Sequence, residues 1–261
     1  MSGLHVYPVK GCAGFSVTST AVDLTGLRDD RMLMLVDDEG VFLSQRKMPA
    51  MAALRPSLVD SSLVIGGESF PVLTDGPRVP VVVHKWQGTG IDQGDVAAAY
   101  FSDALGKPVR LVRTPPDLRR ESGGLTEGVI GYADAHPLLV ISLSSLDGLN
   151  ERILERGGKP VPMNRFRPNV VVSGWPEPHT EDQVRRAVIG DVELGYAKDC
   201  VRCAVPMVDQ ETGQRDGPEP TRTLATYRRD PDGGVTFGMK AAVVSGGTIA
   251  VGDKIDVLEW A

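Results

Sequence analysis

Short apolar segments alternate with turn-forming residues over the first hundred residues of the chain. Each segment is rich in Val, Leu or Ile and is bounded by Gly, Pro or Asp, which is typical of β-strands. Strands are predicted in this way over residues 4–9, 18–24, 32–36, 41–44, 58–65 and 79–84. The tetrad Asp37-Asp38-Glu39-Gly40 lies between two of them and predicts a hairpin turn.

The hydrophobic period then becomes helical. Apolar positions from residue 95 to residue 105 follow one helical stripe, and Gly106 followed by Pro108 is a common helix ending. Residues 114–131 contain two prolines, a glycine pair and several charges without an apolar period, which predicts a linker or a mobile loop. We therefore expect two modules, residues 1–112 and residues 113–261.

The second module is again mainly β in pattern. A strand over 138–142 precedes a helix over 145–156, for which Ser144 is the expected cap. Further strands are predicted at 169–173, 188–189, 192–194, 204–208, 248–251 and 254–258, with a turn at Gly190-Asp191 and a short helix at 222–229. The fold class is therefore mainly β with a few helices (α+β), in two modules, and not a doubly wound parallel sheet.

Composition narrows the class of protein. Hydrophobic residues make up 41% and charged residues 24% of the 261 residues, which is typical of a folded domain. The net charge of −6 argues against broad nucleic-acid binding, although a local group of cations can still hold a small anion. The longest apolar runs, such as 138–143, are too short to span a membrane, and no signal segment follows Met1. We expect a cytoplasmic protein.

Three cysteines are present, and two of them form Cys200-Val201-Arg202-Cys203. This spacing has three ordinary interpretations: half of a zinc site, a redox pair, or two buried residues without chemistry. Zinc would need further ligands, and only Cys12 and four scattered histidines remain. No helix is predicted to start at the pair, as a thioredoxin-like role would require. From the spacing alone, two buried cysteines without chemistry are as well supported as the functional interpretations.

A basic cluster, Asn164-Arg165-Phe166-Arg167-Pro168-Asn169, leads into an apolar strand. Arginine forks and amides at a strand entrance, here Arg165, Arg167 and Asn169, suit a bidentate grip on phosphate or carboxylate. The alternative is a solvated loop with surface ion pairs. Tyr7-Pro8-Val9-Lys10-Gly11 adds a lysine at a strand end, which is either an anion contact or a polar turn.

Several motifs together resemble a known family. In chain order they are Tyr7-Pro8-Val9-Lys10, Asp30-Arg31, Ser44-Gln45-Arg46, Phe166-Arg167-Pro168-Asn169 and Arg202-Cys203. They are similar to those of the two-module MOSC proteins, a family that includes the mitochondrial amidoxime reducing component. The resemblance covers the whole chain and implies an N-terminal MOSC β-barrel-like domain followed by the MOSC β-barrel.

The resemblance implies a molybdenum cofactor, in which molybdenum is bound by a pterin dithiolene and one protein cysteine. By position that catalytic and metal-binding cysteine is Cys203, with Arg202 beside it to favour the thiolate. The residues implied to bind the pterin and its phosphate are Lys10, Gly11, Arg31, Ser142, Ser145, Arg165, Arg167, Asn169 and Arg202. For Ser142 and Ser145, at the start of a predicted helix, the alternative role is helix capping. Cys200 is expected to pack or to support the site. The family is also associated with pyridoxal phosphate binding.

Two positions depart from the family pattern. Gly11 stands where many relatives have Ser, so one phosphate contact there would come from a backbone N–H alone. Phe237-Gly238-Met239-Lys240 lacks the polar amide that often follows the Phe-Gly pair, and Lys240 would favour an anionic or electron-rich substrate.

The implied activity is a molybdenum-pterin oxidoreductase that reduces small N-hydroxylated compounds such as hydroxylamines, amidoximes and N-hydroxylated bases. Three cysteines cannot hold a plant-type iron–sulfur cluster, and no nucleotide-binding glycine motif is present. A separate electron donor is therefore expected, namely a flavoprotein, a ferredoxin or a cytochrome. Two alternatives remain. The first is a carrier of the molybdenum cofactor or of sulfur that turns over no substrate, and the second is an interaction protein without a metal, in which the cysteine pair is structural.

Overall fold

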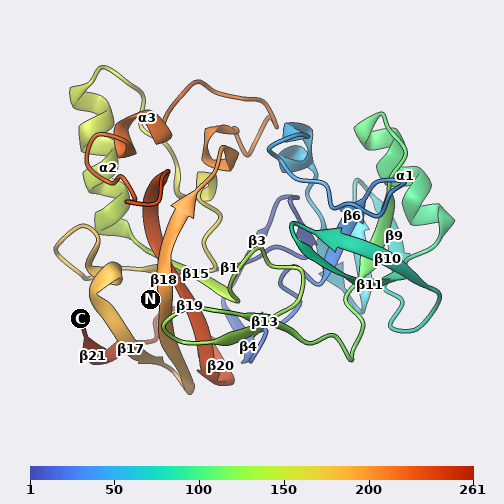
Figure 1. The fold of residues 1–261 in the computed structure, drawn as a ribbon, viewed down its shortest axis with the longest axis horizontal. Coiled ribbons are helices and arrows are strands. Elements are labelled where there is room, and N and C mark those ends of the chain that lie inside the picture. The colour runs from blue at the N-terminus through green and yellow to red at the C-terminus, as the bar shows by residue number, and fades with distance from the viewer.

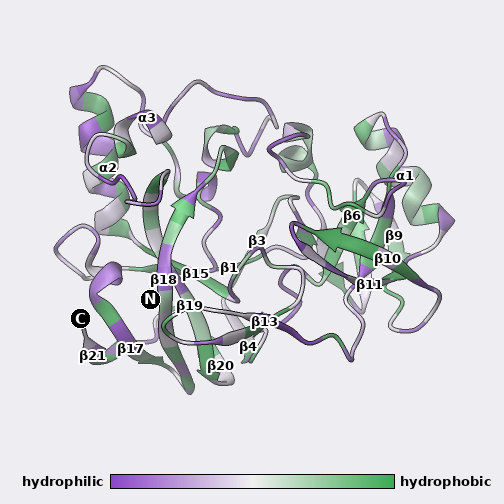
Figure 2. Cartoon of the chain, in the orientation of Figure 1, coloured by the Kyte–Doolittle hydropathy of each residue, from purple (hydrophilic) through white to green (hydrophobic).

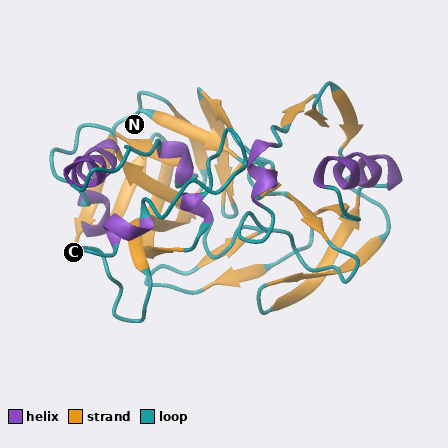
Figure 3. Cartoon of the chain, turned by 90° about the horizontal axis from the view of Figure 1, so that it is seen from above, coloured by secondary structure: helices purple, strands orange, loops and turns teal.

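The computed structural model describes residues 1–261 and has two lobes, each built on a β-sheet (Figure 1). Three α-helices accompany the strands: α1 (Asp95–Leu105), α2 (Leu143–Glu155) and α3 (Thr221–Leu224). Viewed from above, α1 and α2 lie at opposite ends of the molecule (Figure 3). The predicted fold class, mainly β with a few helices, is confirmed. No helix is both long enough and apolar enough to cross a membrane.

The larger lobe contains an eight-stranded sheet in the order β21-β17-β18-β19-β15-β16-β1-β3. Its strands are β1 (Gly3–Val6), β3 (Phe15–Val17), β15 (Leu138–Ser142), β16 (Val170–Val172), β17 (Val184–Ile189), β18 (Val192–Arg202), β19 (Val235–Ser245) and β21 (Ile255–Trp260). Alternate residues of β19, such as Met239 and Ala241, are buried in the core of this lobe. Helix α2 packs with Leu149 and Ile153 against a second apolar cluster that includes Phe166 and Phe237. Tightly packed apolar side chains therefore surround the ends of β15 and β18.

The smaller lobe contains a five-stranded sheet in the order β10-β11-β12-β6-β2. Its strands are β2 (Val9–Lys10), β6 (Leu33–Val36), β10 (Arg78–Val83), β11 (Trp86–Asp92) and β12 (Arg110–Arg113). A three-stranded meander, β7 (Ser57–Val59), β8 (Ser62–Ile65) and β9 (Glu68–Pro71), packs with α1 on its core. The hydrophobic colour along β6 and β10 in Figure 2 marks the strands that supply apolar side chains to this lobe.

The start of the chain passes through both lobes. Strands β1 and β3 pair in the larger sheet, whereas β2 between them pairs with β6 of the smaller one. Strand β4 (Ser19–Asp23) pairs with β5 (Gly26–Leu27) and with β20 (Gly247–Ala250) from the far end of the chain. Lys10 therefore sits where the lobes meet. The boundary expected between the two modules, at residues 112 and 113, stays a prediction.

Most predicted elements are present, and helix 95–105 is confirmed with both ends correct. The turns at residues 37–40 and 190–191 are also confirmed. The predicted strand 58–65 is instead the hairpin β7–β8, turned at Asp60 and Ser61, which both have positive φ. The predicted strand 41–44 makes only isolated bridges.

Three further expectations are wrong. Residues 204–208 form a 3-10 turn, η4 (Val205–Met207), because Pro206 lacks the N–H that a sheet ladder needs. The region expected to be a linker contains the hairpin of β13 (Arg120–Ser122) and β14 (Gly128–Ile130). Helix α2 is capped by Ser142, which accepts from the Ser145 N–H, and not by Ser144. The other short turns are η1 (Pro49–Ala53), η2 (Met163–Arg165) and η3 (Thr180–Gln183).

Candidate functional site

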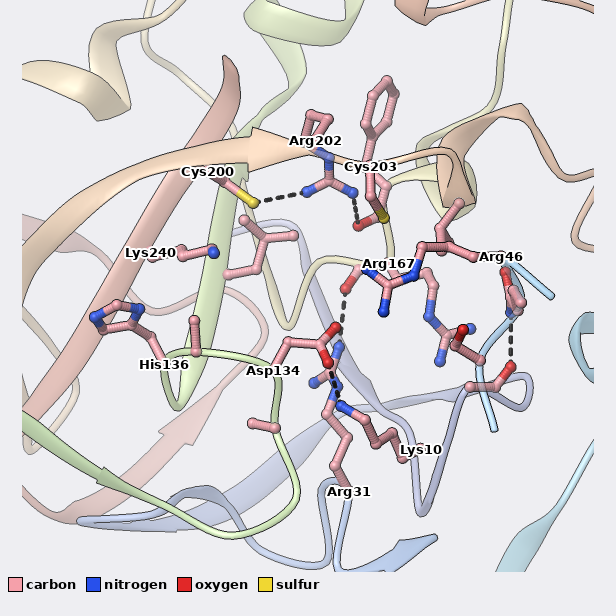
Figure 4. A pocket seen from close by; sticks show the side chains of 18 of the residues that line it. Lys10, Arg31, Arg46, Asp134, His136, Arg167, Cys200, Arg202, Cys203 and Lys240 are labelled. Carbon is pink, nitrogen blue, oxygen red and sulfur yellow. Dashed lines mark hydrogen bonds and ion pairs between the residues drawn. The ribbon is translucent and has the colours of Figure 1, made fainter. Parts of the chain in front are cut away.

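A cavity of about 390 Å³ lies where the two lobes meet. Its walls come from the end of β2, the segments 42–46 and 133–136, the segment 166–169 before β16, and the end of β18 (Figure 4). The Phe166-Arg167-Pro168-Asn169 motif and the Cys200–Cys203 motif, which are far apart in sequence, both line it. This convergence makes the cavity the candidate site.

Positive charge dominates the cavity wall, although the whole chain is acidic. The lining holds six cationic side chains and one carboxylate: Lys10, Arg31, Arg46, Arg167, Arg202 and Lys240, against Asp134. Lys10 pairs with Asp134, and Arg31 pairs with Asp30 behind the wall. The other four cations have no carboxylate oxygen within 4.0 Å. Such a wall favours an anionic ligand.

Arg167 is the most deeply buried of these unpaired cations. It is only 8% exposed, its guanidinium lies 4.3 Å from the Tyr7 ring centroid, and its Nη1 donates to Gln210 Oε1 at 3.3 Å. Its Nη2 is buried and has no hydrogen-bond partner. Burial without a counter-charge lowers the pKa of Arg167 to about 10, so the group remains a cation at neutral pH. An anion in the cavity would satisfy the free Nη2.

Arg31 faces the same aromatic ring. Its guanidinium carbon lies 4.7 Å from the Tyr7 centroid, and its Nη1 donates to Asn169 Oδ1 at 3.1 Å. Both Arg31 and Arg167 have positive φ, 51° and 58°, which is unusual for side chains of this size. Arg167 also precedes Pro168, which further restricts its backbone. This strained backbone geometry occurs at two cationic positions of one cavity, which is a common property of binding sites.

A pair of buried amides connects the lobes beneath Arg167. Gln45 and Gln210 exchange hydrogen bonds of 3.1 and 2.9 Å, and Gln45 also donates to Gly11 O at 2.7 Å. Gln210 accepts from Arg167 through a neutral oxygen, so the guanidinium is oriented without being neutralised. Gly11 itself has φ of 86°, a left-handed backbone conformation that favours glycine.

Cys203 is the exposed member of the cysteine pair, and Cys200 is buried. Both line the cavity. Arg202 donates from Nη1 to Cys200 Sγ at 3.0 Å and from Nη2 to Phe166 O at 2.8 Å. The expected support from Arg202 is therefore given to Cys200, and Cys203 presents an accessible thiol at the end of β18. The third cysteine, Cys12, lies outside the cavity wall, and burial raises the pKa of its thiol to about 12.

Seven of the ten residues predicted for the site line the cavity: Lys10, Gly11, Arg31, Arg167, Asn169, Arg202 and Cys203. Ser142, Ser145 and Arg165 do not. Ser142 caps α2, and the Ser142 and Ser145 hydroxyls donate to the buried Glu181 carboxylate at 2.8 and 2.9 Å. Arg165 turns away to pair with Asp209 and Asp216.

We expect Ser145→Ala to lower the free energy of unfolding by about 1.5–3 kcal/mol, because Glu181 is fully buried and loses a charged hydrogen bond. The cofactor content proposed below should not change. Chemical denaturation and pterin analysis of the same preparation measure the two effects. Ser144→Ala, one residue away, should cost about 0.5–1.5 kcal/mol because its hydroxyl donates to the backbone of Glu177. Pterin loss in Ser145→Ala at unchanged stability would restore the original expectation.

Several lining residues were missing from the predicted site. Asp134 and His136 lie in a loop without periodic signal, and their partners are distant in sequence: Asp134 pairs with Lys10 and lies 3.2 Å from His84 Nε2. Burial lowers the pKa of Lys10. Burial also acts to raise the pKa of Asp134, but Lys10 and His84 together outweigh this effect and hold that pKa well below its usual value. Arg46 was visible as part of Ser44-Gln45-Arg46 but carried no assigned role. No three His, Cys, Asp or Glu side chains cluster in a way that could hold a metal ion.

Comparison with known proteins adds independent findings. The model of the MOSC domain matches residues 127–256, and that of the MOSC N-terminal beta barrel domain matches residues 1–108. Mitochondrial amidoxime-reducing component 1 from Mus musculus is 33% identical over 280 residues, which cover 98% of this chain and 81% of that protein. The Homo sapiens protein of the same name is 31% identical, with 98% and 82% coverage. A molybdenum cofactor sulfurase from Oryza sativa subsp. japonica is 32% identical over 92% of this chain, which spans 32% of that longer protein.

Proposed function

The chain belongs to the MOSC domain family and carries that family's N-terminal β-barrel domain, and from this premise we propose that it is a molybdenum cofactor-dependent reductase of N-hydroxylated compounds. Its similarity to amidoxime-reducing components extends over nearly the whole chain and supports a molybdenum-related role. The observation that carries the proposal is the cavity wall, where four cations without carboxylate partners line the same cavity as an exposed cysteine.

The donor set fits a pterin cofactor with an anionic phosphate. Arg167 Nη2 and Arg202 Nε are buried without a partner, and Arg31 and Asn169 already form a hydrogen-bonded platform beside them. In this proposal Lys10, Arg31 and Arg167 hold the phosphate and the pterin, and the Cys203 thiolate ligates the metal, since a soft donor suits molybdenum bound by dithiolene sulfur. The cofactor, when bound, supplies a two-electron redox centre for cleavage of the N–O bond.

The overall reaction consumes two electrons and two protons: R–NH–OH yields R–NH₂ and water, and the N–O bond is the one that breaks. The protein's own part is to bind the substrate beside Cys203 and to keep the cationic wall rigid through the Gln45–Gln210 amide pair and the Tyr7 ring. Electrons come from a separate redox protein, and cytoplasmic location is part of the same proposal.

A second candidate function is a carrier of the molybdenum cofactor or of sulfur without turnover. The similarity to molybdenum cofactor sulfurases over most of this chain supports this second candidate. Both candidates use the same cavity, so only turnover separates them.

Reduction of benzamidoxime to benzamidine tests the proposed activity. With reduced methyl viologen as electron donor the protein should produce benzamidine, whereas NADH or NADPH alone should give none, because the chain has no nucleotide-binding glycine motif. Product is measured by chromatography. Protein from a host that cannot make the pterin serves as the control for direct reduction by viologen. Full occupancy with molybdenum and pterin but no product would favour the carrier, and turnover with NADH alone would contradict the need for a donor protein.

A further inference from the structure

Lys240 occupies an unusual position in the middle of the larger sheet. It lies in β19, paired with Leu139 of β15 on one side and with Lys198 of β18 on the other. Its neighbours Met239 and Ala241 point into the core of the lobe, so the Lys240 side chain is on the opposite face, where it lines the cavity. A half-buried lysine in a central strand needs a partner for its charge.

The protein supplies no such partner. Neither Lys240 nor the opposite Lys198 has a carboxylate oxygen within 4.0 Å. Like charges on directly paired residues of two strands destabilise a sheet. A role in stabilising the fold therefore explains the Lys240 charge poorly. A contact with an anion that enters the cavity explains it well.

His136 places a hydrogen-bond acceptor on the same wall. The residue is 7% exposed, and its ring Nε2 lies 3.0 Å from Gly123 O, so Nε2 must carry the proton that it donates to this carbonyl. The lone pair is then on Nδ1, which is buried and has no partner. Burial, with smaller contributions from Lys240 and Lys198, lowers the pKa of His136 to about 4 and keeps the ring neutral. A ligand with an N–H or O–H would satisfy this atom.

Lys240 and His136 lie apart from the cations assigned to the cofactor. In Figure 4 they occupy one side of the cavity, beside Cys200, while Lys10, Arg31, Arg167 and Arg46 occupy the other. Cys203 lies next to Arg167 in this view, and Cys200 and Arg202 lie between Lys240 and Cys203. All of these side chains line one cavity, so a molecule bound at Lys240 can extend past Cys200 toward Cys203.

We propose that Lys240 and His136 form a substrate subsite that selects N-hydroxylated compounds bearing an anionic group. Lys240 pairs with the anionic substituent, and His136 Nδ1 accepts a hydrogen bond from an N–H or O–H of the same molecule. The subsite rests on the proposed reductase function and gives it a substrate class. It predicts discrimination between two substrates that differ only in charge.

The test compares 4-carboxybenzamidoxime with benzamidoxime, using holoprotein and a viologen donor. Wild-type protein should favour the carboxylated compound by about tenfold in kcat/KM, mainly through KM, because the pair with Lys240 forms in a partly desolvated cavity. Lys240→Gln should reduce this ratio to about one. Lys198→Gln, which removes the same charge from the paired residue outside the cavity lining, should leave the ratio within about twofold.

His136→Phe adds a second variant that keeps a ring and removes the acceptor. It should raise KM for both compounds by about threefold to tenfold, since each offers an N–H and an O–H to Nδ1. A wild-type ratio near one, or an equal fall of the ratio in Lys240→Gln and Lys198→Gln, would overturn the subsite.

Binding of the two products separates this proposal from the proposed function. Calorimetric titration of holoprotein with 4-carboxybenzamidine and with benzamidine should give the same preference and the same dependence on Lys240, whether or not turnover occurs. If both amidoximes are reduced without preference and both products bind alike, the subsite is wrong and the reductase stands. If neither is reduced but the carboxylated product binds preferentially through Lys240, the subsite stands and the reductase is wrong.

Discussion

Arg167→Ala is expected to give folded protein that retains little molybdenum or pterin. The guanidinium is buried, it is oriented by Tyr7 and Gln210, and its Nη2 is free to bind an anion. Loss of a charge-assisted contact in such a cavity should weaken cofactor retention by about 2–5 kcal/mol. The fold should survive, because no carboxylate depends on Arg167 for its partner.

Arg165→Gln is the matched control, since it changes the same residue type two positions earlier in the same motif. Arg165 is also buried but pairs with Asp209 and Asp216, which do not line the cavity. Its loss should lower the free energy of unfolding by about 1–3 kcal/mol and leave the cofactor bound. Metal analysis, pterin fluorescence after oxidation and thermal unfolding of both variants measure this reciprocal pattern. Normal pterin content in Arg167→Ala, or equal cofactor loss in the two variants, would show the assigned role to be wrong.

The sequence predicts the part of the site that lies on ordered motifs. Lys10 at the end of β2, Arg167 and Asn169 before β16, and Cys203 after β18 all lie next to apolar strands, which fix where their side chains can go. Ser142 and Ser145 do not line the cavity, and the local sequence gives no sign of this. Their partner Glu181 is more than thirty residues away, and nothing in the local pattern indicates a buried carboxylate there.

Prediction of the fold likewise succeeds where the signal is local in sequence and fails where it depends on distant residues. Helix α1 was predicted with its ends because period and capping glycine are local signals. The passage of β1, β2 and β3 through two sheets depends on pairing with strands far along the chain, which no local pattern encodes. Residues 204–208 are apolar, as in a strand, but Pro206 lacks the N–H that a sheet ladder needs. The segment therefore forms a 3-10 turn instead.

Cys203→Ser is expected to abolish reduction of N-hydroxylated compounds, by more than about a hundredfold, because it exchanges a soft thiolate for a hard, poorly ionised hydroxyl. The fold should be unaffected, since Cys203 is exposed. Some pterin should remain, because the contacts of Arg167 and Lys10 are unchanged.

Cys200→Ser is the matched control from the same motif. Cys200 Sγ accepts from Arg202, but Arg202 is also held by Phe166 O at 2.8 Å, so a hydroxyl at position 200 should be tolerated with mild loss. A disulfide or zinc site would need both cysteines equally. Comparable loss of activity in the two variants would therefore favour a paired role over the assignment of Cys203 alone.

The proposed function requires that the cationic cavity holds the molybdenum cofactor through Cys203. Its most direct test is the molybdenum and pterin content per chain of wild-type, Cys203→Ser and Cys200→Ser proteins, freshly purified side by side from a host that makes the cofactor. We expect close to one molybdenum and one pterin per chain in the wild type and in Cys200→Ser, and a marked loss of molybdenum relative to pterin in Cys203→Ser. Wild-type protein without molybdenum and pterin, or with one zinc per chain in their place, would contradict the claim.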